Sequence, residues 1–182
     1  MDLTCCRGER VLFQDLRFAV PAGHVALVTG PNGSGKSTLL RTLAGLLTPL
    51  SGRVSGPDGV HHVGHAHALS SGLTLRRNVQ FWSGLFGGDA EAAMDAVGLS
   101  HVLDLPVSAL SAGQRQRAAL GRLLLAPRPA WLLDEPTAAL DEAGATTVAR
   151  LLDRHAASGG LAVVATHRSV PTSAPVVSVR LG

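Results

Sequence analysis

The chain has 182 residues, of which 46% are hydrophobic and 16% are charged. This length and balance predict one globular domain with a buried core and exclude a disordered or fibrous chain. The net charge is only +3 and the basic residues are spread along the chain, so we expect no nucleic-acid partner.

The positions of the cysteines and the lengths of the apolar runs indicate the cellular compartment of the protein. Cys5 and Cys6 are adjacent, so a disulfide between them would be strained and no disulfide framework is available. Charged residues interrupt positions 1–20, which argues against a secretory signal, and no apolar run is long enough for a membrane helix. We therefore expect a protein of the reducing cytoplasm that reaches a membrane only through a partner.

The first third of the chain predicts two strands and a helix around a glycine-rich loop. Residues 12–20 alternate loosely between apolar and polar side chains, and a Pro-Ala-Gly turn follows at 21–23. Residues 25–29 form a short β-branched run that is typical of a buried strand. After the loop, leucines at helical spacing predict a helix over 37–47, which Thr48-Pro49 ends.

The loop matches the phosphate-binding pattern G-x-x-x-x-G-K-[ST] in full. Its glycines let the backbone wrap phosphates, its lysine reaches the β and γ oxygens, and its hydroxyl binds magnesium. Lys36 is the only lysine among sixteen basic residues, at a place where arginine is a poor substitute. We predict ATP binding by the loop and by the neighbouring hydroxyl: Gly30, Pro31, Asn32, Gly33, Ser34, Gly35, Lys36, Ser37 and Thr38. A turn without a ligand is the alternative, and the motif alone also fits a kinase or a GTPase.

The middle of the chain predicts an inserted helical lobe. Residues 73–85 and 89–97 can each be written as a helix, which suggests an insert over about 68–113 within a single domain of residues 1–182. A glycine-rich stretch before the lobe contains His61, His62, His65 and His67. These histidines lack the helical pair or cysteine partners of a metal or haem site, so we interpret them as loop histidines at a surface or interface.

Two acidic residues follow the next buried strand, which is predicted over 130–133. Asp134 can bind magnesium and Glu135 can act as the general base on water, although a solvated strand end is the alternative. A helix over 143–155 and a strand over 161–166 follow, and His167 comes directly after that strand. This order of elements predicts an α/β fold with a parallel sheet.

A second anion site is predicted before a helix over residues 114–126. Its segment is Leu110, Ser111, Ala112, Gly113 and Gln114, and the start of a helix presents free N–H groups to an anion. We call residues 110–114 the signature segment.

These motifs, in this order and spacing, resemble the ATP-binding cassette (ABC) family, whose signature is usually written LSGGQ. The resemblance implies a P-loop NTPase fold with a parallel core sheet, flanking helices, a small antiparallel β part and an inserted α-helical subdomain. It assigns residues 138–141, including Asp141, to the D-loop and His167 to the switch histidine that contacts the γ-phosphate. Lys36 and Glu135 join His167 as catalytic residues, with ATP and Mg²⁺ as cofactors.

The resemblance also implies a homodimer, because the family's signature segment covers ATP that the other subunit holds.

At two positions this chain differs from the usual sequence pattern of the family. Where the family places an aromatic residue against adenine, this chain offers Arg7, which can stack on a base or remain an ordinary exposed arginine. Where the family has a loop glutamine, this chain has Ala66, so that role is lost or is taken by a neighbouring histidine.

Within the family, residues 3–10, Gly64-His65 and the signature segment are similar to ATPase subunits of the haem exporters of cytochrome c maturation, over roughly residues 3–170. This implies ATP use in haem delivery or in release of a haem chaperone, with a CcmB-like integral permease and further cytochrome c maturation proteins as partners. It also implies a peripheral place on the cytoplasmic face of the bacterial inner membrane. An exporter ATPase for lipids, peptides or drugs is the alternative; non-transport ABC ATPases have long coiled coils or tandem cassettes, which this sequence lacks.

Overall fold

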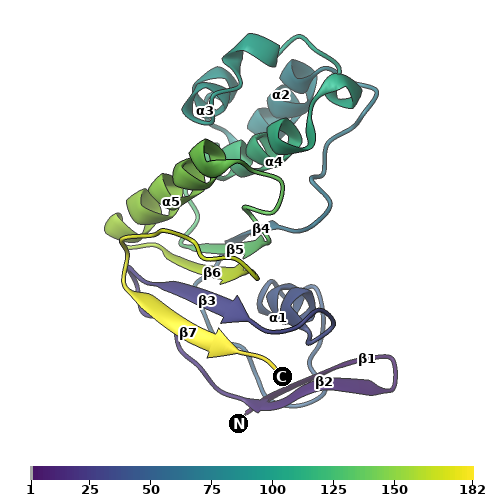
Figure 1. Ribbon diagram of the computed structural model, residues 1–182, viewed down its shortest axis with the longest axis vertical. Coiled ribbons are helices and arrows are strands. Elements are labelled where there is room, and N and C mark those ends of the chain that lie inside the picture. The colour runs from purple at the N-terminus through teal and green to yellow at the C-terminus, as the bar shows by residue number, and fades with distance from the viewer. Residues whose placement is uncertain (1) are drawn as a thin grey trace.

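A five-stranded parallel sheet forms the centre of the computed structural model, which describes residues 2–182 (Figure 1). Its strands in spatial order are β4 (Val60–Val63), β5 (Ala130–Asp134), β6 (Leu161–Ala165), β3 (Val25–Thr29) and β7 (Val176–Arg180). The three central strands, β5, β6 and β3, are short and rich in valine, leucine and alanine, as expected for strands that are covered on both faces.

The sheet order brings the predicted motifs to one edge. β3 pairs with β6 and β6 pairs with β5, all in parallel, so the segments that follow these three strands leave the sheet side by side. Ligands of open α/β sheets bind at this carboxyl edge. The phosphate loop follows β3, Glu135 follows β5 and His167 lies beyond β6, so the sheet register alone gathers them.

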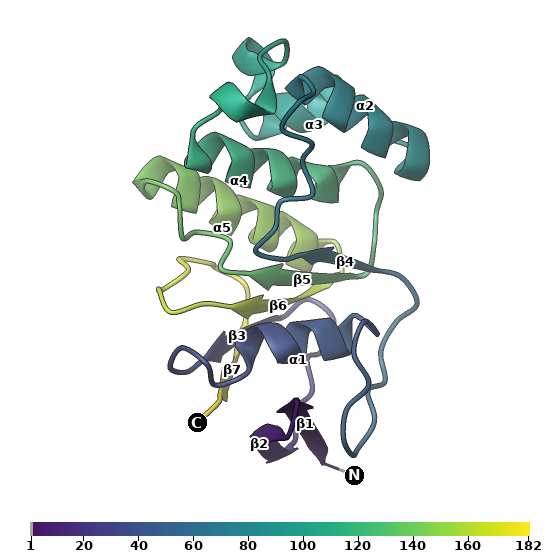
Figure 2. The same ribbon diagram turned by 90° about the vertical axis from the view of Figure 1, so that its right-hand side faces the viewer.

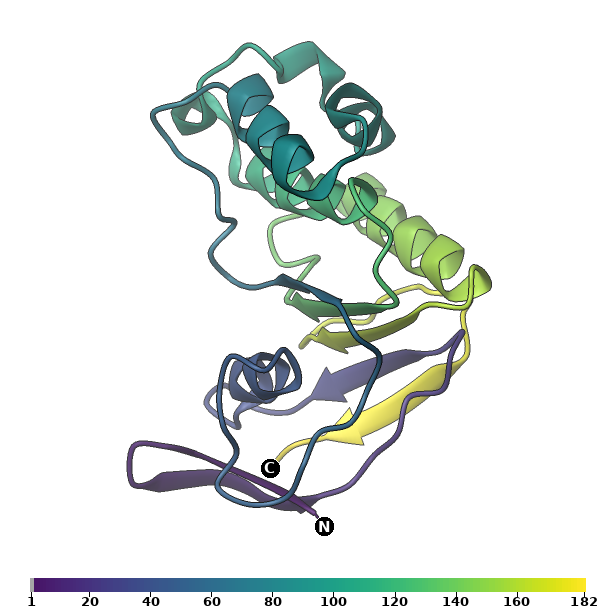
Figure 3. The same ribbon diagram turned by 180° about the vertical axis from the view of Figure 1, so that it is seen from behind.

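One face of the sheet is covered by α1 (Lys36–Leu43) and by a β-hairpin of β1 (Leu3–Arg7) and β2 (Arg10–Leu16), as Figures 1 and 3 show. Leu39 and Leu40 of α1 are fully buried there against Leu132 and Val163 of the sheet and Phe13 of the hairpin. The hairpin is the small antiparallel part that the resemblance implies.

The other face is covered by α5 (Glu142–Ala157) and then α4 (Ala112–Gly121), with α2 (Leu75–Phe86) and α3 (Ala90–Ala96) beyond them (Figure 2). Short 3₁₀ turns are η1 (Ser100–Val102), η2 (Val107–Ala109) and η3 (Arg122–Leu124). Trp131 and Leu133 of β5 face this layer while Leu132 between them faces α1, since side chains alternate along a strand. No helix within residues 2–182 is long and apolar enough to cross a membrane.

Several predicted element boundaries were wrong. The first predicted strand ends at Leu16 instead of residue 20, and the first helix ends at Leu43 instead of 47, where the backbone turns at Gly45 with a positive φ. The signature helix runs from Ala112 to Gly121 before a 3₁₀ turn. Strands β1, β4 and β7 were not predicted. The omission of β4 affects the interpretation of His61 and His62, which lie on this strand.

The interpretation of His61 and His62 as loop histidines was wrong, because both lie on β4. His61 is buried, and its Nε2 lies 2.9 Å from the carbonyl oxygen of Ala126. Burial lowers the pKa of both imidazoles below the usual value. These two histidines therefore belong to the packed sheet, whereas His65 is exposed in the segment that follows it.

Candidate nucleotide-binding site

The glycine-rich loop holds a backbone shape that only glycine adopts easily. Gly30, Gly33 and Gly35 have φ angles of 150°, 83° and 102°. A Cβ atom on Gly35 would come within 2.9 Å of the Phe13 ring and 3.1 Å of Leu12, so strand β2 rests directly on the loop. The loop and the hairpin therefore form one continuous surface.

Lys36 is the first residue of α1, and only 7% of it is exposed. Its Nζ donates hydrogen bonds to the carbonyl oxygens of Gly30 at 2.8 Å and Pro31 at 3.1 Å. The ammonium group is thereby held inside the ring of the loop, beside the free N–H groups at the start of α1. This combination of charge and amide donors suits an anion with several oxygens, such as a polyphosphate.

A pocket of about 260 Å³ opens over the loop, and we call it the nucleotide pocket. Its lining residues come from the hairpin, the phosphate loop, the segment after β4 and the end of β5: Arg7, Leu12, Asn32, Gly33, Gly35, Lys36, Ser37, Thr38, His65, Asp134 and Glu135. Three separately predicted motifs thus meet in one cavity. Leu12 had no place in the sequence-based site, because only the fold brings the hairpin to the loop. His65 is one of the histidines next to Ala66 that could take the role of the family's loop glutamine.

Glu135 and His167 are in contact at the carboxyl edge of the sheet. Glu135 adopts a φ of 50°, which is uncommon for a residue with a side chain and is often found at functional sites. Its backbone N–H donates to the carbonyl oxygen of Ala165 at 2.8 Å, and its carboxylate Oε2 lies 2.9 Å from His167 Nδ1. The Glu135 side chain is 17% exposed, so it is sheltered yet still reaches the pocket.

Asp134 is the last residue of β5, and only 8% of it is exposed. It lies opposite Ala165 in the sheet register and lines the nucleotide pocket together with Ser37. A carboxylate and a hydroxyl oxygen are ligands that Mg²⁺ accepts. Within residues 2–182, no cluster of three or more His, Cys, Asp or Glu side chains could hold a metal ion.

The signature segment lies outside this pocket. Ser111 caps α4 by accepting the N–H of Gln114 at 3.1 Å, and the Gln114 side chain accepts the N–H of Ser111 at 2.8 Å. Gly113 approaches the D-loop so closely that a Cβ atom would lie 3.0 Å from the Ala139 carbonyl oxygen. Asp141 caps α5 by accepting the Gly144 N–H at 2.8 Å. Within one chain, therefore, the structure does not bring the signature segment to the phosphate loop.

Gln116 was missed by sequence reasoning. Only 6% of it is exposed, its Oε1 lies 2.7 Å from His67 Nε2, and its amide group donates to the carbonyl oxygen of Pro136 at 3.2 Å. This one side chain joins α4 both to the segment after β4 and to the loop that follows Glu135. Ala66 is exposed next to this link and does not line the nucleotide pocket.

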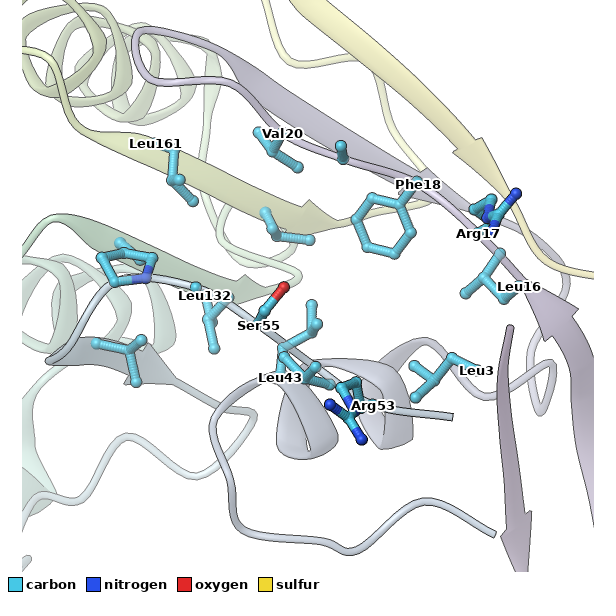
Figure 4. Close-up of a pocket in the computed structure, with 17 residues that line it drawn as sticks. Leu3, Leu16, Arg17, Phe18, Val20, Leu43, Arg53, Ser55, Leu132 and Leu161 are labelled. Atoms are coloured by element: carbon cyan, nitrogen blue, oxygen red, sulfur yellow. The ribbon is translucent and has the colours of Figure 1, made fainter. Parts of the chain in front are cut away.

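A larger pocket of about 370 Å³ lies on the α1 face of the sheet, away from the phosphate loop (Figure 4). Leu132, Leu161 and Phe18 are among its apolar lining residues, and Arg17 and Arg53 are its charged ones. It contains no residue of the phosphate loop or of the acidic pair. The smaller pocket, which contains the glycine-rich loop, Lys36 and the acidic pair, is therefore the nucleotide-site candidate.

Comparisons with known proteins agree with this geometry. The family described as ABC transporter matches residues 13–138. The chain belongs to the ABC transporter family. Both the family resemblance and the fold class predicted from the sequence are confirmed, and the chain is an ATP-binding ABC ATPase.

Curated relatives of this chain carry the name cytochrome c biogenesis ATP-binding export protein CcmA. The one from Nitrobacter winogradskyi is 43% identical over 192 residues, covering 99% of this chain and 95% of its own length. The one from Rhizobium meliloti is 47% identical over 184 residues, covering 91% and 88%. Within the ABC transporter family, this chain is thus similar to CcmA proteins over most of its length.

Solved structures give the same result for the fold. An ATP-binding subunit of an ABC transporter superposes with a TM-score of 0.79 at 25% identity, covering 91% of this chain and 77% of that one. An ABC transporter ATP-binding protein from Pyrococcus furiosus superposes with a TM-score of 0.81 at 21% identity, covering 97% and 94%. The second likeness concerns the fold alone.

Proposed function

We propose that this chain is the ATP-hydrolysing subunit of the haem exporter of c-type cytochrome maturation. The observation that supports ATP hydrolysis is the presence of Lys36, Asp134 and Glu135 in one pocket. The His167 imidazole lies against the Glu135 carboxylate. The likeness to CcmA proteins over most of both chains supports the export system. In this system ATP hydrolysis would drive haem delivery or the release of a haem-loaded chaperone.

The chemistry follows from the positions of the pocket residues. The phosphate loop from Gly30 to Thr38 would bind the phosphates through its amides and through the Lys36 ammonium. Glu135 would accept a proton from the attacking water, and His167 would orient its carboxylate and contact the γ-phosphate. Mg²⁺, held by Ser37 and Asp134, would neutralise charge on the phosphate oxygens.

The signature segment supports a homodimer as the working form. Ser111 and Gly113 are displayed at the start of α4, outside the nucleotide pocket of their own chain. A second copy would bring them over the γ-phosphate, where a helix start stabilises developing negative charge. Asp141 in the D-loop would then lie at the boundary between the two copies.

The chain would act as a single ABC ATPase domain over residues 1–182, with the helical lobe at about 68–113 as its insert. Its partner would be a CcmB-like integral permease, together with further cytochrome c maturation proteins. Attachment to that permease would put the chain peripherally on the cytoplasmic face of the bacterial inner membrane. The choice between haem and another exported substrate, such as a lipid, peptide or drug, depends on that permease.

Deletion of the gene tests the haem assignment. We expect c-type cytochromes to be lost while b-type haem proteins remain, because haem synthesis itself is untouched. Unchanged c-type cytochromes would refute the assignment. Purification of the tagged full chain from membranes should also recover a CcmB-like permease, and recovery of a permease of a lipid, peptide or drug exporter instead would favour the alternative.

A further inference from the structure

The pocket of about 370 Å³ on the α1 face of the sheet, which we call the sheet-face pocket, reaches the amino ends of three strands. Its lining residues Val60, Ala130 and Leu161 begin β4, β5 and β6. The nucleotide pocket lies instead at the carboxyl edge of the sheet, and the two pockets share no lining residue. A ligand in the sheet-face pocket would therefore leave the nucleotide pocket open.

Apolar side chains form the floor and much of the wall of the sheet-face pocket (Figure 4). Leu132 and Val163 belong to the buried core on this face of the sheet. Five further lining residues pack against that core but are only half-buried: Leu16, Phe18, Val20, Leu43 and Val60. The core is thus incompletely covered at this place, and an apolar body in the pocket would remove the uncovered surface from water.

The size of the sheet-face pocket suits a small organic molecule. Its volume of about 370 Å³ exceeds the 260 Å³ of the nucleotide pocket. Ligand pockets of proteins measure about 300–1,000 Å³ and combine a mostly apolar lining with a few polar groups that orient the ligand. One wall of the sheet-face pocket is the exposed segment 53–57, which is neither helix nor strand.

The charged residues that line the sheet-face pocket are both arginines, Arg17 and Arg53. Both are exposed, so their guanidinium groups lie where the pocket meets solvent. Arg17 Nε lies 3.2 Å from Asp2 Oδ1, but the Arg17 side chain is 81% exposed, and ion pairs at such exposed places contribute little. Within residues 2–182, no carboxylate lies within ion-pair distance of Arg53. The opening of the pocket therefore offers positive charge to an anionic group.

We propose that the sheet-face pocket binds an amphipathic organic acid, whose apolar chain covers the open part of the core and whose carboxylate is held by Arg53 and Arg17. Guanidinium groups bind carboxylates through paired, charge-assisted hydrogen bonds. An inorganic anion would leave the apolar floor uncovered, and a hydrocarbon would leave the arginines without a partner. This binding site goes beyond the proposed ATPase function and does not depend on it.

Calorimetric titration of the full-length chain with laurate tests the site. Decanoate serves as the shorter acid and dodecyltrimethylammonium as the cation with the same chain, each below its micelle concentration. We expect one laurate per chain with a Kd of about 100 μM or tighter. Decanoate should bind about three- to fifteenfold more weakly, because each buried CH₂ group contributes about a factor of four. The cation should bind about tenfold more weakly or less, because the arginines repel it.

Variants separate the acid-binding part of the pocket from the apolar part. Arg53→Gln should weaken laurate binding by about fivefold or more and Arg17→Gln by about twofold or more, because charged hydrogen bonds are lost. Arg150→Gln, which removes an exposed arginine from α5 on the other face of the sheet, is the control. Val20→Trp should fill the pocket and abolish binding, whereas Val11→Trp, at an exposed position of β2 outside the pocket, should not.

Several results would overturn the site. These are no saturable laurate binding by the wild type, equal affinity for the cation, equal affinity for decanoate, or unchanged affinity in the Arg17→Gln/Arg53→Gln double variant. Full binding by folded Val20→Trp would also contradict it, and the arginine variants, which change exposed side chains, decide the question if Val20→Trp does not fold. Lys36→Ala should bind laurate like the wild type, so failure of the nucleotide pocket and failure of this site give different results.

Discussion

His167 Nδ1 lies 2.9 Å from Oε2 of Glu135, and the backbone N–H of His167 donates to the same oxygen at 3.4 Å. The two residues are 32 positions apart in sequence, yet they follow β5 and β6, which pair with Asp134 opposite Ala165. The sheet register therefore creates the pair. It holds Oε2 of the Glu135 carboxylate against His167.

Replacement of the proposed general base should separate binding from turnover. We expect Glu135→Gln to bind ATP like the wild type while hydrolysis falls by about 100-fold or more, because an amide cannot accept the water proton. ATP should also trap the variant as a dimer, seen as a doubled mass in light scattering. Glu142→Gln, which changes an exposed acid in the first turn of α5, is the control. Retained turnover in Glu135→Gln would remove Glu135 from this role.

Loss of the imidazole beside Glu135 should act on the chemical step alone. We expect His167→Ala to slow single-turnover hydrolysis by about tenfold or more with little change in the Kd for ATP, because the carboxylate loses its orienting partner. His101→Ala, at an exposed position on η1, should leave the rate unchanged. A His167→Ala variant with the wild-type rate would show that the 2.9 Å contact between His167 Nδ1 and Glu135 Oε2 does not contribute to catalysis.

The buried Gln116 should contribute measurable stability. Gln116→Leu leaves His67 and the Pro136 carbonyl without their partner, which should cost about 1–3 kcal/mol in the free energy of unfolding. Urea denaturation measures this cost, and Gln80→Leu on the exposed side of α2 is the control. Equal stability of both variants would mean that the link between α4 and its neighbours is dispensable.

Buried and half-buried histidines should make the fold sensitive to acid. Burial lowers the pKa of His61, His62 and His155 in the folded state, so the unfolded chain binds protons more readily. Their contribution to stability is therefore complete above the unfolded pKa of about 6.5 and is lost as the pH falls below it. We expect the free energy of unfolding to be lower at pH 5.5 than at pH 7.5.

One variant isolates this acid effect. His155 stacks on Trp131 with ring centroids 3.9 Å apart, so His155→Phe keeps a ring at that place but removes the titrating group. The loss of stability between pH 7.5 and 5.5 should be smaller in this variant than in the wild type. An equal loss in both proteins, or a wild type that is more stable at pH 5.5, would contradict the assignment.

The strongest local patterns predicted much of this molecule. The phosphate loop and the acidic end of β5 could be located because their chemistry requires fixed residue types at fixed spacing. The strand Val25–Thr29 was placed with its observed bounds for a similar reason, since a short β-branched run between a turn and a glycine-rich loop leaves little choice.

Sequence-based prediction failed for residues whose structural partners are distant in the sequence. His61 and His62 are polar, yet the pairing of β4 with β5 and the bond from Ala126 draw them into the sheet. The link from Gln116 to His67 spans 49 positions and leaves no periodic trace in the sequence. Leu12 enters the nucleotide pocket for the same reason, because the hairpin is placed by packing instead of by local pattern.

The most direct test of the whole account is MgATP binding and hydrolysis by the Lys36→Ala and Lys36→Arg variants of the full chain. Lys36 holds the centre of the phosphate loop, and a guanidinium cannot replace a compact ammonium there. Both variants should lose hydrolysis, and Lys36→Ala should also lose most of its affinity for ATP. Hydrolysis by Lys36→Ala at the wild-type rate would contradict the placement of ATP in this pocket.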